Sequence, residues 1–477
     1  IMTEMSPDYI QLHGDETPSR VAEIAKTFRV KTLKAVGIAN DDDMKSAETY
    51  AGVADMLLYD AKPPKDADAR GGHGIAVDWA VIARAPAQNI IAGSTKQLVI
   101  AITAIQFVRT ASPRDIVIAT VPIDDIRTAA PILQDMHRAA MAGHTGYAAV
   151  PGTNALRDTV AQRVQDRTGV KTTRDNVLIT PGGQSALYAA HMVTCDAGDT
   201  ALYLDPFYAT YPGTLRGVSA TPKCIETRAS DAFQPRARDI AAAAKGAKSL
   251  LINSPNNPTG AIYSDATLRA IREACLSHDL WCLSDEVYDS QVHSGRHVSP
   301  RQLPDMAERS LVIGSLSKSH VMTGFRLGWL VGPAPFIGPL TDLTNATTYG
   351  APGFVQDAAF AAITEGAHDE TETAALYTRR RNCALDALQG VNTLRISPPD
   401  GAMYVMLDVR QTGLTGEQFA NRLLDEKHIA VMPGESFGAA AAGHIRIAMT
   451  VDDATFATAL TKICDAAERW TKTRKMT

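Results

Sequence analysis

Short apolar runs alternate with segments of helical periodicity from Asp175 onward, and this alternation limits the possible folds more than any other feature. Stretches such as DATLRAIREACLSHD have the apolar spacing of amphipathic helices. Between them lie runs with the length of buried strands: NVLIT, TALYLD, SLLIN, LWCLSDEVY and LVIGSLSK. Strands that alternate with helices in this way build a parallel sheet with crossover helices. The pattern therefore predicts an α/β fold.

Polar groups follow four of these runs at the point where each expected strand ends. NVLIT leads into residues 181–184, SLLIN into 254–260, LWCLS into 285–288 and LVIG into 315–318. Ligands of open parallel sheets bind outside the carboxyl ends of the strands. We therefore expect these four segments to surround one ligand.

The rest of the chain predicts further units. Residues 381–477 contain two strand-like runs, GAMYVMLDV and HIRIAMT, with the helix-like GEQFANRLLDEK between them, which predicts a small α+β domain. Residues 1–94 contain YIQLHG, TLKAVGI, DMLLYD and NIIAGS, which are typical of the strands of βα repeats. We expect residues 95–114 to be a linker and residues 115–380 to form the large domain with the ligand site.

Composition argues against several classes of protein. The chain has 47 Lys and Arg against 52 Asp and Glu, a net charge of -5 that is too even for a nucleic-acid or anionic-membrane surface. The longest apolar run, residues 98–107, is shorter than the roughly 20 residues that cross a bilayer, and no secretory signal is visible. The six cysteines form no C-x-x-C pair, so neither disulfides nor a metal site is expected. These features predict small-molecule chemistry in the cytoplasm.

Seven segments carry a resemblance to a known family: TGYAAVPGTNALR, TPGGQSALY, DPFYATYP, NSPNNPTG, SDEVY, SLSKSHVMTGFRLGW and GHIR. In this order and spacing they resemble the class I/II aminotransferases of the fold-type I pyridoxal-phosphate enzymes. The resemblance implies a large domain with a mostly parallel sheet, a small C-terminal domain and pyridoxal 5'-phosphate as cofactor. It also implies transfer of an amino group from an L-amino acid to a 2-oxo acid such as pyruvate.

Lys318 is the residue on which the implied activity depends. A cofactor aldehyde needs an amine to form a Schiff base, which the substrate amine then displaces. The freed lysine is suited to move a proton between the substrate Cα and the cofactor, as base and then as acid. The alternative interpretation of Lys318 is a solvated surface lysine. The position of Lys318 between serines and before M-T-G-F-R argues against that alternative.

The resemblance implies that three side chains bind the cofactor ring. Asp285 matches the partner of the ring nitrogen, where a carboxylate keeps the ring protonated and therefore a strong electron sink. Its alternative role is that of a helix N-cap after the strand. Tyr288 and Asn257 match the partners of the phenolic oxygen, and Asn257 also suits the turn of an N-P-T-G bend.

The phosphate of the cofactor needs backbone donors and cations. Gly183 and Gln184 lie at a strand-to-helix turn, where their N–H groups can face an anion. Ser315, Ser317 and Arg326 add hydroxyl groups and a guanidinium. The resemblance therefore implies that these five residues bind the phosphate.

Three more residues match family positions. Tyr208 matches the aromatic side chain that stacks on the ring, although a core aromatic is the alternative. Arg446 matches the arginine that grips the substrate carboxylate as a bidentate pair, with a solvent-facing strand arginine as the alternative. Tyr147 matches a tyrosine that reaches the phosphate of a neighbouring subunit, which implies a homodimer.

Segments outside the catalytic signature favour one group within the family. VSPRQLPDMAERS, YGAPGFVQDAAF, TGEQFANRLLD and GESFGAAAAGHIR are most similar to arginine:pyruvate transaminases. These segments lie partly outside the pocket, so arginine as the amino donor is a hypothesis.

Two features depart from the family pattern. Residues 122–125 read Pro-Ile-Asp-Asp where the family carries G-E-P-D or G-D-P-D, and proline removes both the flexibility of glycine and a backbone donor. The N-terminal arm of the family has no recognisable counterpart in residues 95–112. We expect the first feature to affect substrate binding and the second to leave incomplete the domain that the arm normally closes.

Residues 7–94 resemble a second family, the phosphoribosylanthranilate isomerases, through IQLHGDET, LKAVGI, ADMLLYDAKPP, GGHGIAVDW and NIIAGS. Asp60 matches the general acid of that family. The strand with the catalytic cysteine and the last, phosphate-binding strands have no counterpart. A (β/α)8 barrel usually takes about 200 to 250 residues. We therefore expect an incomplete barrel without isomerase activity.

Three other functions remain open from the sequence. Another fold-type I enzyme, such as a β-lyase, would have similar cofactor residues. A ligand-sensing regulator would need a basic helix-turn-helix, and the N-terminal βα repeats do not supply one. A degenerate fusion with weak cofactor binding is the third.

Overall fold

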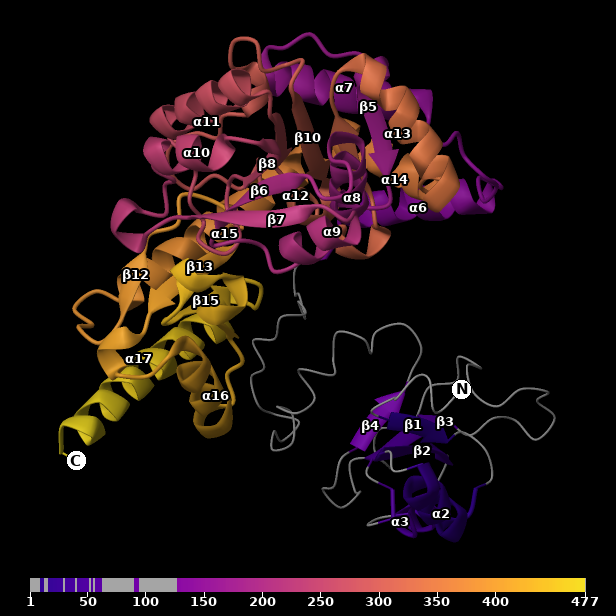
Figure 1. The fold of residues 1–477 in the computed structure, drawn as a ribbon, viewed down its shortest axis with the longest axis vertical. Helices are drawn as coiled ribbons and strands as arrows, with labels where there is room; N and C mark the ends of the chain where they lie inside the picture. The colour runs from indigo at the N-terminus through magenta and orange to yellow at the C-terminus, as the bar shows by residue number, and fades with distance from the viewer. Residues whose placement is uncertain are drawn as a thin grey trace. The chain divides into compact units, whose positions relative to one another are not determined.

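The computed structural model describes residues 9–12, 16–28, 31–38, 41–50, 53–54, 56–61, 90–93 and 127–476. The chain divides into two compact units, Ile1–Arg114 and Asp115–Thr477 (Figure 1). Residues 95–112 and 122–125, where the sequence departs from the family pattern, lie outside the described residues. Within the described part of the chain, no helix is long and apolar enough to cross a membrane.

The first unit contains a parallel sheet in the order β1-β2-β3-β4. Its strands are β1 (Tyr9–Leu12), β2 (Lys31–Ile38), β3 (Met56–Ala61) and β4 (Ile90–Gly93). Helix α2 (Pro18–Phe28) follows β1 and helix α3 (Asp41–Glu48) follows β2. The four strand-like runs expected here are confirmed. Asp60 lies on β3, opposite Gly93 of β4.

The second unit is built on a seven-stranded sheet in the order β5-β11-β10-β9-β8-β6-β7. Strand β11 runs antiparallel to both of its neighbours, β5 and β10, and the other strand pairs described in this sheet are parallel. The strands are β5 (Val177–Thr180), β6 (Thr200–Asp205), β7 (Thr221–Glu226), β8 (Ala247–Asn253), β9 (Trp281–Asp285), β10 (Ser310–Ser315) and β11 (Gly328–Val331). The expected mostly parallel α/β sheet is confirmed.

Two of these strands, β7 and β11, were absent from the sequence prediction. Strand β7 lies at the edge of the sheet and is mostly exposed, so it lacks an apolar run. Strand β11 is only four residues long and follows the Lys318 segment closely in sequence. Strand β7 therefore lacks the pattern of a buried strand, whereas β11 is apolar and buried and was not separated from the Lys318 segment.

Helices cover both faces of the sheet, because alternate strand residues point to opposite sides. Leu311 and Ile313 of β10 pack with α8 (Gly183–Thr194) and α13 (Ala334–Thr347). Val312 packs with α7 (Asn154–Thr168) and α14 (Gly353–Glu365). Helices α10 (Ala237–Ala244) and α11 (Asp265–His278) cover β6 and β8. Every residue of β10 is therefore buried.

A smaller antiparallel sheet follows, in the order β12-β13-β15-β14. Its strands are β12 (Arg395–Ser397), β13 (Tyr404–Asp408), β14 (Met432–Pro433) and β15 (His444–Ala448). They pack with α15 (Ala367–Ala387), α16 (Gly416–Lys427) and α17 (Asp453–Met476) around a core that includes Phe419 and Phe456. The expected strands GAMYVMLDV and HIRIAMT and the helix GEQFANRLLDEK are confirmed, with shorter strand bounds.

Candidate active site

Parallel pairing brings three strand ends to one edge of the large sheet. Asp285 at the end of β9 lies opposite Asn253 of β8 and Ile313 of β10. Strand β10 continues into the short helix α12 (Leu316–Ser319), which carries Lys318. The polar segments that the sequence placed at these strand ends are therefore neighbours in the fold.

Asp285 is a buried carboxylate with few partners. The Tyr211 hydroxyl donates to Oδ2 at 2.7 Å, and the Val287 N–H donates to Oδ1 at 3.3 Å. Burial raises the pKa of Asp285 to about 6, although these hydrogen bonds and the charge of Lys318 favour the ionised form. The Asp285 carboxylate is thus poised to accept a positively charged partner.

Local capping holds the Lys318 turn in place. The Ser315 Oγ accepts a hydrogen bond from the Ser317 N–H at 3.0 Å and caps α12. It also donates to the carbonyl oxygen of Leu327 at 2.9 Å. Gln291 Nε2 donates to the Lys318 carbonyl oxygen at 3.0 Å. The backbone is therefore fixed on both sides of Lys318, while its side chain is partly exposed.

The N-terminus of α8 forms a cradle with Arg326. Gly182 caps this helix at φ 85°, and a Cβ atom there would collide with the Arg326 guanidinium. Only glycine therefore lets the guanidinium lie against this turn. The Gln184 side chain is engaged with Thr214 and Thr210. The first N–H groups of α8 and the Arg326 cation give this turn the character of an anion site.

Arg446 links the small sheet to the large one. Its Nη1 donates to Asn257 Oδ1 at 2.9 Å, and its Nε is buried without a hydrogen-bond partner among the described residues. The guanidinium carbon lies 4.3 Å from the ring centre of Tyr404 and 4.6 Å from that of Phe437. Arg446 is therefore buried rather than solvent-facing. Its Nε–H remains able to donate to an anionic ligand.

Three tyrosines among the candidates occupy different environments. Tyr288 is buried, and its hydroxyl lies 3.1 Å from that of Tyr404. Tyr208 packs edge-on against Tyr211, and burial, followed by the nearby Tyr404 and Asp285, raises its pKa. Tyr147 is 92% exposed and contacts only the ring of Tyr349 among the described aromatic side chains. Tyr147 therefore stands apart from the pocket of its own chain.

Two site residues were not singled out in the sequence. Tyr211 lies three residues after Tyr208 and begins helix α9 (Tyr211–Gly217), where its hydroxyl reaches Asp285. Tyr404 begins β13, far from every large-domain motif. DPFYATYP contains Tyr211, so its position was a weak signal, whereas nothing in the sequence links Tyr404 to Tyr288.

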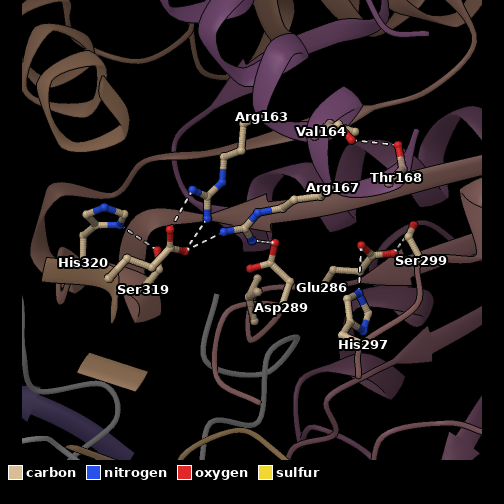
Figure 2. Close-up of polar contacts among 12 residues, drawn as sticks. Arg163, Val164, Arg167, Thr168, Glu286, Asp289, His297, Ser299, Ser319 and His320 are labelled. Atoms are coloured by element: carbon tan, nitrogen blue, oxygen red, sulfur yellow. Dashed lines mark hydrogen bonds and ion pairs between the residues drawn. The ribbon is translucent and has the colours of Figure 1, made fainter. Parts of the chain in front are cut away.

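A separate polar network supports the segment that follows Tyr288 (Figure 2). Arg163 on α7 makes two hydrogen bonds to Glu370 on α15, at 3.0 and 2.5 Å. Arg167 bonds both Glu370 and Asp289. Burial opposes the ionisation of Glu370, but the two arginines lower its pKa to about 2. The network ties α7, α15 and the segment after Tyr288 together.

Glu286 forms a second group of contacts in the same region. Its carboxylate accepts hydrogen bonds from Ser284 and Ser299 and pairs with His297 Nε2 at 3.2 Å (Figure 2). A cavity of about 340 Å³ is lined by Glu286, His297 and the Arg163–Asp289 network, and by none of the candidate cofactor residues. This cavity is therefore not the expected cofactor pocket, and the residues that line it support the segment after Tyr288.

The strand-end residues fit pyridoxal 5'-phosphate. Within the described part of the chain the Asp285 carboxylate bonds Tyr211 and the Val287 N–H and forms no ion pair, and a protonated ring nitrogen would supply a cationic partner. The glycine cradle at α8 and Arg326 suit a phosphate, and Lys318 supplies the amine. A mostly parallel sheet with such a site defines the class of pyridoxal-phosphate enzymes.

Comparison with known proteins places the chain within that class. Residues 119–463 match the family model Aminotransferase class I and II. Residues 1–108 match the model N-(5'phosphoribosyl)anthranilate (PRA) isomerase. The arginine–pyruvate transaminase of Pseudomonas aeruginosa is 40% identical over 322 residues, 67% of this chain and 82% of that protein.

Solved structures agree with the sequence comparison. Aspartate aminotransferase from Thermus thermophilus with maleate has a TM-score of 0.70 and 29% identity, covering 74% of this chain and 91% of that one. The aromatic aminotransferase from Pyrococcus horikoshii has a TM-score of 0.71 and 27% identity, covering 78% and 100%. The chain belongs to the class I and II aminotransferases. It depends on pyridoxal phosphate and transfers an amino group between an amino acid and a 2-oxo acid.

The Glu370 network predicts a stability effect. Glu370→Gln should lower the free energy of unfolding in urea by about 2 kcal/mol, because two largely buried arginines lose their shared carboxylate. Glu372→Gln on the same helix is the control, since Glu372 is exposed and its ion pair within the described part of the chain is with the exposed His368. Equal losses in the two variants would contradict a stabilising role for the network.

Proposed function

We propose that this enzyme transfers the amino group of arginine to a 2-oxo acid such as pyruvate, in a site formed at the strand ends of the large sheet. The juxtaposition of Asp285, the Lys318 turn and the α8 cradle carries the assignment of the site. The cofactor ligands in this proposal are Gly183, Gln184, Tyr208, Asn257, Asp285, Tyr288, Ser315, Ser317, Lys318 and Arg326.

Lys318 is the catalytic base of the proposal. The bound cofactor supplies the electron sink that makes the substrate Cα–H acidic. The Lys318 Nζ would take the proton from Cα and deliver it to the cofactor carbon on the other side of the substrate nitrogen, and water would then release the 2-oxo acid and leave the amino group on the cofactor. The position of Lys318 on a capped turn with both sides of its backbone held supports this role.

Asp285 and Arg446 set the electrostatics at opposite ends of the site. The Asp285 carboxylate holds a proton on the ring nitrogen, and its burial strengthens that attraction. Arg446 binds the α-carboxylate of the substrate and orients the Cα–H bond. The unpartnered Nε of Arg446 and its fixed guanidinium plane support this assignment.

The donor is proposed from the relative that shares 40% identity, which is an arginine–pyruvate transaminase. A guanidinium substrate needs acidic or polar partners in the pocket. The segments that resemble that group of enzymes include GESFGAAAAGHIR, which carries both Phe437 and Arg446. The identity with that relative supports arginine as the donor, whereas Arg446 would bind the α-carboxylate that all amino acids share.

The half-reaction tests donor and chemistry together. Arginine added to the holoenzyme, with pyruvate held back, should replace the visible band of the lysine-bound cofactor by that of the amine form. We expect conversion by arginine about tenfold or more faster than by aspartate. Lys318→Ala is the control and should lack both the band and turnover. Conversion by aspartate but not arginine would contradict the donor, and no conversion by any amino acid would contradict the site assignment.

A homodimer is the assembly we propose, with Tyr147 directed to the partner's phosphate site. Its 92% exposure and its separation from the pocket of its own chain support this arrangement. A tyrosine that binds the cofactor of its own chain would lie beside the cofactor ligands named above.

Mixed dimers test this arrangement. Lys318→Ala and Tyr147→Phe chains should each have low activity alone. Co-assembled, they form dimers in which one site has both residues intact, so activity should return to about a quarter of the wild-type value with random pairing. If activity stays at the level of the separate variants, Tyr147 does not act across the dimer.

Two further proposals concern the N-terminal unit and the compartment. The described residues of the N-terminal unit form a four-stranded open sheet, whereas an isomerase barrel has eight strands, so we propose no isomerase activity. Turnover of phosphoribosylanthranilate would contradict this. Six free cysteines suit the reducing cytoplasm, and fractionation of cells would test that location.

A further inference from the structure

Tyr404 contacts both ends of the proposed site. Its hydroxyl lies 3.1 Å from that of Tyr288, and the two rings meet at 79° with centres 5.9 Å apart. The Arg446 guanidinium carbon lies 4.3 Å from the centre of its ring. One side chain of the small domain therefore touches the residue proposed for the cofactor oxygen and the residue proposed for the substrate carboxylate.

Backbone pairing fixes this arrangement. Tyr404 of β13 lies opposite Ala448 of β15, and Met406 lies opposite Arg446. Tyr404 and Arg446 are therefore diagonal neighbours on one face of the small sheet, within reach of long side chains. Phe437 contacts the same guanidinium at 4.6 Å. The guanidinium plane is thus held by aromatic rings as well as by its bond to Asn257.

The hydroxyl pair has a defined direction once Tyr288 acts on the cofactor. A phenol has a single proton to donate. If Tyr288 donates it to the phenolic oxygen of the ring, Tyr404 becomes the donor within the pair. Burial, followed by the neighbouring Tyr404, raises the pKa of Tyr288 well above its usual value, so Tyr288 keeps its proton at neutral pH. A hydrogen bond accepted by Tyr288 strengthens the bond that it donates.

We propose that Tyr404 is a positioning residue for both halves of the site. Its hydroxyl directs the Tyr288 proton toward the cofactor oxygen, and its ring holds the Arg446 guanidinium for the substrate carboxylate. This inference rests on the roles proposed above for Tyr288 and Arg446.

Other charged and titratable groups face this pair and stay constant in the test. Asp285 of β9, Tyr211 of α9 and Tyr208 just before α9 act on Tyr288, and Arg446 of β15 contacts the Tyr404 ring. Lys318 and Arg326 act on Asp285 and Tyr208 in turn. A change confined to Tyr404 therefore reports on its own hydroxyl or ring.

Tyr404→Phe isolates the hydroxyl. In the holoenzyme, the pH at which the visible band of the lysine-bound cofactor titrates should rise by about half a unit to one unit, the effect of one weakened neutral hydrogen bond. KM for the amino donor should change less than about twofold, because the ring under Arg446 remains. Tyr404→Leu removes the ring as well, and KM should rise by about tenfold.

Two further variants make the result decisive. Tyr203→Phe, a buried tyrosine of the large-domain core, is the matched control and should leave the titration unchanged. Tyr288→Phe should shift the titration at least as far as Tyr404→Phe. A shift in Tyr288→Phe with a wild-type titration in Tyr404→Phe would overturn the inference and leave the role of Tyr288 intact. Wild-type titration in both variants would overturn the role of Tyr288 and this inference together.

Discussion

A carboxylate buried at the end of β9 sets the requirements that the rest of the site meets. Burial raises the pKa of Asp285 to about 6, and the Tyr211 hydroxyl is the side-chain donor that reaches it. Such an anion is costly unless a cation or further hydrogen bonds stabilise it. The fold places it at the edge where the strands on either side also end in polar segments. A protonated ring nitrogen bound there would meet this need.

Two of the contacts at the site join side chains of the small sheet to segments of the large domain. Arg446 bonds Asn257, and Tyr404 meets Tyr288, so each contact joins a small-sheet residue to a segment that follows a strand of the large sheet. Behind the segment that follows Tyr288, the Arg163–Glu370–Arg167 network anchors the first turn of α15, the helix that leads into the small domain. Alignment of the two sheets is therefore part of the geometry of the site.

The features that could be predicted from the sequence are those that local residue patterns specify. Buried strands such as β10 and the polar turns after them were visible, because apolar runs and parallel topology together specify where strand ends meet. Tyr404 was not predicted, because its contacts are not local in sequence. Tyr288 lies 116 residues before it, and Arg446 lies on a different strand. The Glu370 network was missed for the same reason, since Arg163 and Arg167 lie more than 200 residues before Glu370. The role of residues 122–125 stays a prediction, because they lie outside the described residues.

The most direct test of the role of Asp285 is the ¹⁵N chemical shift of the ring nitrogen of labelled cofactor bound to the wild-type enzyme and to Asp285→Asn, both near pH 8. Asparagine preserves an acceptor for Tyr211 but carries no charge. Above its pKa of about 6, Asp285 is ionised, so the wild-type ring nitrogen should be protonated and that of the variant should not. The same shift in both proteins would contradict the conclusion that Asp285 holds this proton.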